Sequence, residues 1–176
     1  MSTLHAPAAT TAQAPQQAAP QAATPANLAT PNAPKGIDPR APQVNAIITA
    51  LVLVAILVTP TPVALALTAL QTLLFANGAI RGVQRTPHAW FFKRFVKPRL
   101  APPTELEAPE PPRFAQAVGL VFTAVALVGY ATGVLLLGQV AIGFALVAAT
   151  LNAVFRFCLG CELFLLVKRA AATRIA

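Results

Sequence analysis

Two cysteines and a glutamate near the C-terminus are the residues whose types and spacing best fit chemistry. Cys158 and Cys161 are separated by two residues, and Glu162 follows directly. The chain of 176 residues holds no other cysteine, and two thiols at this spacing form a disulfide where the backbone allows it. Such pairs serve thiol–disulfide exchange or bind soft metal ions. The motif predicts a redox or sulfur-handling site in which Cys158 and Cys161 react and Glu162 accepts a proton.

Other interpretations of this motif stay open. Cysteines are small residues that are often buried, so the pair could serve only to pack a helix. Metal binding is disfavoured because two thiolates do not complete a tetrahedral site and His88 is far away in the sequence. We expect no bound metal ion and no cofactor. A small transporter or metal-handling protein and a structural accessory subunit are the rival functions, and the sequence leaves open whether the chain is an enzyme.

The composition is that of an integral membrane protein. Hydrophobic residues make up 56% of the chain and charged residues 10%, whereas soluble domains carry about 25% charged residues. No charged residue lies within 41–80 or 114–155, and each stretch is long enough for two spans of about 20 residues. We therefore expect an all-α protein with four transmembrane helices. Their expected ranges are about 43–59, 62–80, 115–131 and 140–167.

Prolines and glycines divide each stretch into two helices. Residues 59–62 read Thr-Pro-Thr-Pro, and proline cannot continue a helix interior but is favoured at a first helical position. Gly133 and Gly138 mark the turn in the second stretch. The expected helix over 140–167 is long for one straight span, which permits a break at residues 159–160.

A break at that place would matter for the cysteines. In an unbroken helix they lie toward the C-terminal end, where the helix dipole disfavours a thiolate. The negative charge of Glu162 would disfavour it further. A break would instead put Cys161 and Glu162 on the first turn of a new helix, where the dipole favours a thiolate.

Lysine and arginine placement predicts the orientation in the membrane. Basic residues lie before the first helix, in the loop 81–113 and at the C-terminus, whereas the two short hairpin turns have none. Positively charged segments stay in the cytoplasm. We therefore expect a multi-pass protein of the bacterial cytoplasmic (inner) membrane with both termini and the loop in the cytoplasm. The net charge of +8 is explained in this way, so membrane lipid is an expected partner and nucleic acid is not.

The segments outside the spans have distinct compositions. Residues 1–37 are mostly Ala, Pro, Gln and Thr, which offer too little apolar surface to offset the entropy of ordering. We expect a disordered cytoplasmic tail there and a transmembrane domain over 38–169. Residues 90–97 interleave aromatic and basic side chains, which predicts a short interfacial helix. Residues 105–112 are acidic and proline-rich, which predicts an exposed linker.

Polar residues recur in the two halves of the chain. Arg and Gln open the first helix of each half with an offset of 73 residues (113 minus 40), and Asn and Arg close the second with an offset of 75 (152 minus 77). Both halves enter and leave on the same side, so we expect two parallel-repeat hairpins related by a pseudo-twofold axis along the membrane normal. The eight residues would form a supporting polar cluster: Arg40, Gln43, Asn77, Arg81, Arg113, Gln116, Asn152 and Arg156.

Several of these segments resemble a known family. Residues 38–40 (Asp-Pro-Arg), residues 112–116 (Pro-Arg-Phe-Ala-Gln), and Asn152 with residues 157–163 are similar to the bacterial membrane proteins grouped as domain of unknown function 4395. The resemblance covers about residues 36–169, and its most specific element is the Cys-x-x-Cys-Glu motif. It implies thioredoxin-like or rhodanese-type sulfur chemistry. The expected partner is a thioredoxin-fold protein, a sulfurtransferase or a quinone, and transport would need a homo-oligomer because four helices leave little room for a pore.

Overall fold

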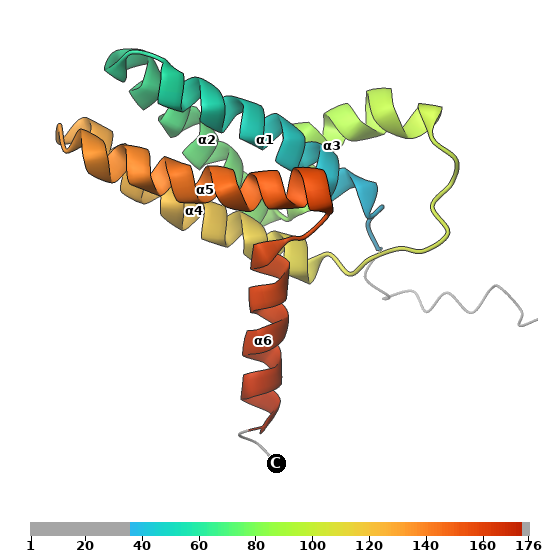
Figure 1. Ribbon diagram of the computed structural model, residues 1–176. Helices are drawn as coiled ribbons and strands as arrows, with labels where there is room; N and C mark the ends of the chain where they lie inside the picture. Colours follow the sequence, from blue (N-terminus) through green and yellow to red (C-terminus); the bar gives the residue numbers. More distant parts are fainter. Residues whose placement is uncertain (1–35, 174–176) are drawn as a thin grey trace, which may run out of the picture. The chain divides into compact units, whose positions relative to one another are not determined.

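The computed structural model describes residues 36–173, which are mostly helical (Figure 1). Two helical hairpins are separated by a loop of short helical turns, and one more helix follows the second hairpin. The β contact within the described residues is an isolated antiparallel bridge between Ile37 and Glu107. In chain order the helices are α1 (Arg40–Val58), α2 (Thr61–Arg81), η1 (Val83–Arg85), α3 (Pro87–Phe91), η2 (Phe92–Val96), η3 (Lys97–Arg99), α4 (Glu110–Ala131), α5 (Leu135–Phe155) and α6 (Leu159–Thr173).

Among the described residues, four helices are long and apolar enough to cross a membrane: α1, α2, α4 and α5. The first hairpin turns at Thr59 and Pro60, where proline interrupts the helical hydrogen bonds. The second turns around Gly133, whose φ of +80° is a conformation that glycine adopts without strain. The expected all-helical, multi-pass membrane architecture is confirmed.

The four spans pack as a bundle in which each hairpin contacts the other through both of its helices. Helix α1 packs against α2 and α5, and α4 packs against α5 and α2. The core includes Leu53, Ile56, Ala126 and Ile142, all at most 1% exposed. Large apolar side chains also cover the outer faces of the spans, as a lipid-facing surface requires.

Small residues let the spans approach closely. A Cβ added at Gly129 of α4 would lie 2.6 Å from the backbone nitrogen of Gly138 in α5. The sequence predicted that Gly138 marks the turn, but it lies inside α5 and serves this contact and a contact with Tyr130. Such glycine contacts are a common way to join helices in a membrane, where apolar burial drives little association.

The contacts between the hairpins agree with the proposed internal repeat. Gln43 of α1 donates from Nε2 to the carbonyl oxygen of Ala153 in α5, at 3.0 Å. Gln116 of α4 packs on Gly78 of α2, where an added Cβ would lie 2.7 Å from its Oε1. Gly78 precedes Ala153 by 75 residues (153 minus 78), the offset read from the sequence. The twofold rotation itself stays a prediction that these paired contacts support.

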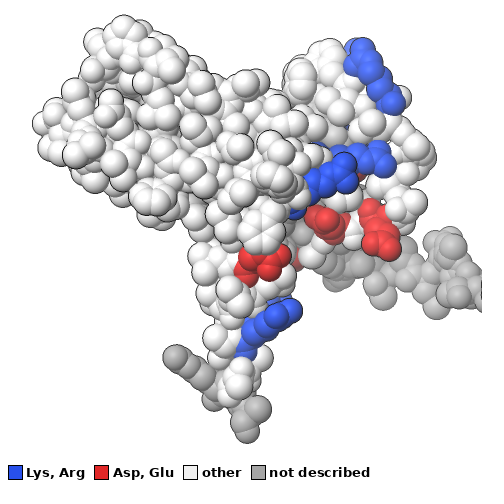
Figure 2. Space-filling model, in the orientation of Figure 1, with Lys and Arg blue, Asp and Glu red and all other residues white. Residues whose placement is uncertain are grey.

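Charged residues gather at one end of the bundle, called here the basic end. Figure 2 shows the opposite end, on the face in view, without lysine, arginine, aspartate or glutamate. The segment before α1, the loop between α2 and α4, and α6 all lie at the basic end, since both hairpin turns lie at the other. That this end faces the cytoplasm, and that the membrane is the bacterial inner membrane, stay predictions.

The structure places the limits of two segments outside the spans differently from the prediction. The predicted tail covers residues 1–37, of which residues 1–35 lie outside the described part of the chain. Ile37 is buried and exchanges two backbone hydrogen bonds with Glu107, at 2.8 and 2.9 Å. The linker predicted over 105–112 is exposed at residues 105–108, as expected, although Glu107 pairs with Ile37 and helix α4 begins at Glu110. Helix α4 accommodates its prolines because a first turn leaves the backbone N–H groups without helical partners.

The loop at the basic end is largely helical, as the aromatic and basic pattern of residues 90–97 predicts. Helix α3 and the π-helical turn η2 follow one another without a gap, and Thr86 caps α3 by accepting the N–H of Ala89 at 3.2 Å. Trp90 and Phe95 are exposed and touch edge to face. Burial lowers the pKa of His88 from its usual 6.5, so this side chain is neutral at pH 7 and adds nothing to the basic charge.

Candidate functional site

The expected single helix over 140–167 is two helices, and the break lies ahead of the cysteines. Helix α5 ends at Phe155 because Arg156 adopts a left-handed conformation, with φ 56° and ψ 22°. The Arg156 N–H donates to the Asn152 carbonyl at 3.1 Å, which closes the helix end in the usual left-handed manner. The chain then turns, and α6 begins at Leu159. The break falls earlier than the sequence suggested, since Gly160 lies inside α6.

Cys158 is the residue just before the first residue of α6, Leu159. Its Sγ accepts the backbone N–H of Cys161 at 3.3 Å, the contact that an N-terminal capping side chain makes. The two cysteines form a disulfide with their Cα atoms 5.2 Å apart, so they lie within reach of one another as predicted. A sulfur at this position lies at the positive end of the helix dipole, which favours a thiolate when the pair is reduced.

Helix α6 is held against the start of α4. A Cβ added at Gly160 would lie 2.6 Å from both the Cα and the Cβ of Ala115, so glycine is required for this approach. The Phe114 and Phe164 rings pack with their centroids 5.7 Å apart. These contacts fix the first turn of α6, and with it the disulfide, to the second hairpin (Figure 1).

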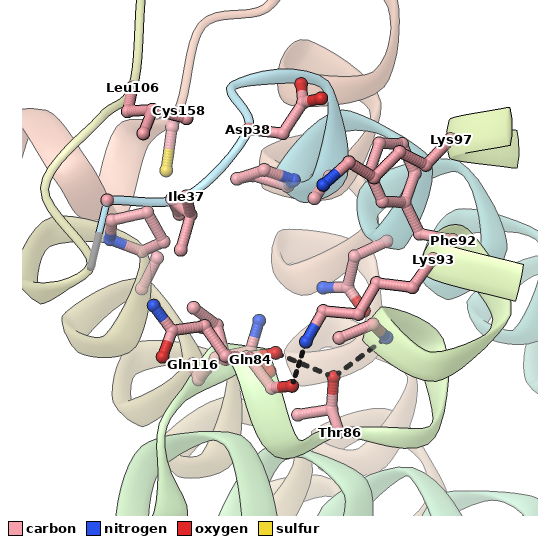
Figure 3. A pocket seen from close by; sticks show the side chains of 18 of the residues that line it. Ile37, Asp38, Gln84, Thr86, Phe92, Lys93, Lys97, Leu106, Gln116 and Cys158 are labelled. Carbon is pink, nitrogen blue, oxygen red and sulfur yellow. Dashed lines mark hydrogen bonds between the residues drawn. The ribbon is translucent and has the colours of Figure 1, made fainter. Parts of the chain in front are cut away.

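Cys158 lines two neighbouring cavities. The first, called here the loop cavity, has a volume of about 390 Å³ and lies between the basic-end loop, the segment before α1 and the first turns of α4. Figure 3 shows the Cys158 sulfur and the amino groups of Lys93 and Lys97 around one open space. The second, called the span cavity, has a volume of about 260 Å³ and lies among α1, α4, α5 and α6. Five residues line both: Asn45, Ala115, Gln116, Asn152 and Cys158.

The eight repeated polar residues do not form a single cluster around the cysteines. Gln116 and Asn152 lie with Cys158 at the junction of the two cavities. Arg113 instead donates to the carbonyls of Ala79 and Ile80, at 2.7 and 2.9 Å, and so closes the end of α2.

The remaining repeated residues also serve the backbone or lie at the surface. Besides the Gln43 bond described above, Arg40 donates to the Ala101 carbonyl at 2.9 Å and Asn77 to the Arg85 carbonyl at 3.4 Å. Arg81 and Arg156 are exposed. The predicted supporting cluster is thus mainly a set of contacts that join chain segments, and two of its members belong to the site.

The predicted third reactive group, Glu162, is placed differently from the sulfurs. Its side chain is exposed and lines neither cavity, although its N–H donates to the Cys158 carbonyl at 3.0 Å. A carboxylate in the first turn is favourable for the helix dipole. Its placement fits support of the start of α6 better than proton transfer inside a cavity.

Sequence reasoning missed several residues that line the site. Asn45 and Thr49 share one face of α1, one turn apart, and both line the span cavity. Lys93 and Lys97 share the same spacing in the loop and line the loop cavity. The available signal was a polar side chain inside an apolar span, but Asn45 has no counterpart in the other half, where Val118 stands 73 residues later.

Replacing Arg156 with glycine is expected to stabilise the protein by about 1 kcal/mol, because a side chain in the left-handed region costs about 1–2 kcal/mol and glycine does not. The check is the thermal unfolding midpoint of the detergent-solubilised chain, which should rise by a few degrees. Arg156→Ala is the matched control, since it removes the charge but keeps the Cβ. Equal shifts for the two variants would contradict this account.

The comparisons with known proteins agree with the resemblance seen in the sequence. The family model described as "Domain of unknown function (DUF4395)" matches residues 37–169, which include all four spans and the Cys-x-x-Cys motif. No curated protein and no solved structure matches the chain. Because the matched residues make up most of the sequence, the chain belongs to the domain of unknown function 4395 family.

Proposed function

We propose that this membrane protein performs thiol–disulfide exchange, with Cys158 as the attacking thiol and Cys161 as the resolving thiol. The observation that carries the assignment is the position of Cys158 at the start of α6, with its sulfur accepting the Cys161 N–H. Cys158 also lines both cavities, whereas Cys161 is absent from both linings. A partner that enters either cavity therefore contacts Cys158 before Cys161.

The exchange balances as two sequential displacements. In the reduced protein, the Cys158 thiolate attacks one sulfur of a partner disulfide, which breaks that bond, forms a mixed disulfide and releases the other partner sulfur as a thiolate. The Cys161 thiolate then attacks the Cys158 sulfur, closes the internal disulfide and releases the second partner thiolate. Two electrons pass to the partner, and the two protons of the dithiol end on its thiols. The reverse sequence reduces the protein.

The loop cavity favours an anionic partner. Lys93 and Lys97 face it with Asp38, so the lysines leave a net positive charge. An excess of one sign of charge in a cleft concentrates ligands of the opposite sign. A water-soluble, anionic thiol or disulfide therefore fits this cavity, and a thioredoxin-fold protein or a sulfurtransferase would be a source of suitable chemistry.

Glutathione disulfide, which is anionic, is expected to oxidise the reduced protein about tenfold faster than cystamine, a cationic disulfide. The rate of disulfide closure in detergent is read by alkylating the remaining thiols and counting them by mass spectrometry. The double variant Lys93→Gln, Lys97→Gln should lose the preference while its rate with cystamine does not fall. Failure of both reagents to close the pair would overturn the proposed function.

Among the rival functions, metal handling would need more ligands than the two cysteines supply. Within residues 36–173, no group of three His, Cys, Asp or Glu side chains could hold a metal ion. A purely structural role for the cysteines predicts instead that serine variants keep their function.

A further inference from the structure

We infer that the span cavity binds the head group of a lipid-soluble quinone, which exchanges two electrons with the Cys158–Cys161 pair. The inference rests on the proposed function, because the cysteines must be redox-active for electrons to pass. The observation behind it is that Cys158 belongs to both cavities, one at the basic-end loop and one among the membrane spans.

The span cavity reaches from the lipid-facing surface to the middle of the bundle. At its outer side are Phe144 and Val147 of the span α5, which are 61% and 57% exposed. At its inner side are Thr49 and Ala145, which are 3% and 6% exposed. A ligand dissolved in the bilayer can therefore enter from the side, with its polar head inward and its apolar tail in the lipid.

The inner side carries a hydroxyl that the protein leaves unpaired. The Thr49 Oγ1 is buried and has no hydrogen-bond partner within residues 36–173. Other helical threonines, such as Thr68, Thr72 and Thr123, donate to the carbonyl four residues earlier. A buried hydroxyl without a partner costs about 1–3 kcal/mol, and a carbonyl of a bound ligand would remove this cost. Thr59 and Gln71 also have unpaired buried oxygens, but they line neither cavity.

The chemistry of the lining selects an uncharged head group with hydrogen-bonding oxygens. None of the described residues that line the span cavity is charged, and its polar groups are the Thr49 hydroxyl, the side-chain amides of Asn45, Gln116 and Asn152, and Cys158. The volume of about 260 Å³ is near the lower end of ligand pockets, about 300 Å³, which suits a single ring whose tail stays outside. The Phe122 and Phe144 rings, whose centroids are 6.2 Å apart, add aromatic apolar surface to the lining.

The redox step balances with a quinone alone. The reduced pair gives up two electrons and two protons as its disulfide forms, and the quinone takes up both to become a quinol. The reverse step reduces the disulfide at the expense of a quinol. A dithiol couple and a quinone couple thus match in electrons and in protons, which a one-electron carrier would not.

The test uses the full chain, reduced and placed in lipid nanodiscs without oxygen, with decylubiquinone as the probe. The ring of this quinone is fully substituted, so it cannot simply add to a thiol. We expect one quinol to appear for each disulfide formed, read by quinone absorbance and by thiol alkylation. Thr49→Val, which removes the hydroxyl but keeps the shape, should raise the KM for the quinone about tenfold and leave oxidation by glutathione disulfide unchanged.

A second pair of variants tests the route of entry. Ala148 lines the span cavity, and Ala148→Phe should block the quinone reaction while glutathione disulfide still closes the pair. Val140→Phe is the matched control, since Val140 is 48% exposed on the same helix and lines neither cavity. A protein that glutathione disulfide oxidises and decylubiquinone does not, or a quinone reaction that neither Thr49→Val nor Ala148→Phe changes, would overturn this inference and leave the proposed function standing. If neither oxidant closes the pair, the proposed function fails and the inference with it.

Discussion

Replacing Cys158 with serine is expected to abolish disulfide exchange while leaving membrane insertion and abundance unchanged and the thermal stability equal to that of the reduced wild-type protein. Serine carries a hydroxyl in place of the thiol that ionises and attacks a disulfide, so no mixed disulfide can form at position 158. It is also a preferred residue at the start of a helix, where its hydroxyl can accept the Cys161 N–H that the sulfur accepts now. The measurements are the rate of thiol loss with glutathione disulfide and the thermal midpoint in detergent.

Cys161→Ser is the paired variant and should behave differently. Its Cys158 can still attack, but nothing resolves the product, so the variant should accumulate a stable mixed disulfide with one glutathione per chain, visible as a mass increase. The opposite pattern, with Cys161 trapping the partner and Cys158 dispensable, would contradict the assigned roles. Serine variants that keep full cellular function would instead support a packing role for both cysteines.

Replacing Gly160 with alanine is expected to destabilise the protein by about 1–3 kcal/mol. The new Cβ would lie 2.6 Å from the Cα and Cβ of Ala115, and neither atom can move unless the backbone of α4 moves. The start of α6 must therefore shift away from α4, and the disulfide shifts with it. We expect a lower thermal midpoint and slower closure of the reduced pair by glutathione disulfide.

Gly143→Ala is the matched control for this variant. Gly143 lies within α5, and a Cβ added there meets no atom within 4 Å. Alanine is favoured over glycine in a helix by about 1 kcal/mol, so the control should be neutral or slightly stabilising. Equal changes in the thermal midpoint of the two variants would show that the contact with Ala115 does not decide the outcome.

The spans could be predicted from the sequence because charge, proline and glycine act locally. The charge-free stretches and the Thr-Pro-Thr-Pro turn fixed three of the four helices to within a few residues. The starts were less accurate for a physical reason. Helix α1 begins early because the Asp38 carboxylate accepts the Arg40 N–H at 3.0 Å, and α4 begins early because a first turn tolerates proline.

The break before α6 and the surroundings of the cysteines could not be read in the same way. Arginine is not a residue that marks a left-handed turn, so nothing at position 156 signalled the end of α5. The relation between Cys158, Asn45 and Lys93 depends on how helices from three parts of the chain pack together, which periodicity does not reveal. Asn45 and Thr49 have no polar counterparts in the other half of the chain, so the repeated polar positions do not include them.

The bridge between Ile37 and Glu107 also bears on how the protein assembles. It joins the segment ahead of one hairpin to the segment ahead of the other, so the first hairpin forms a closed loop. The entropy lost in closing a loop grows only slowly with the length of the loop, and here it is lost once, when the bridge forms. The second hairpin then starts beside the first rather than at the end of a free tether, which raises the effective concentration of one hairpin for the other.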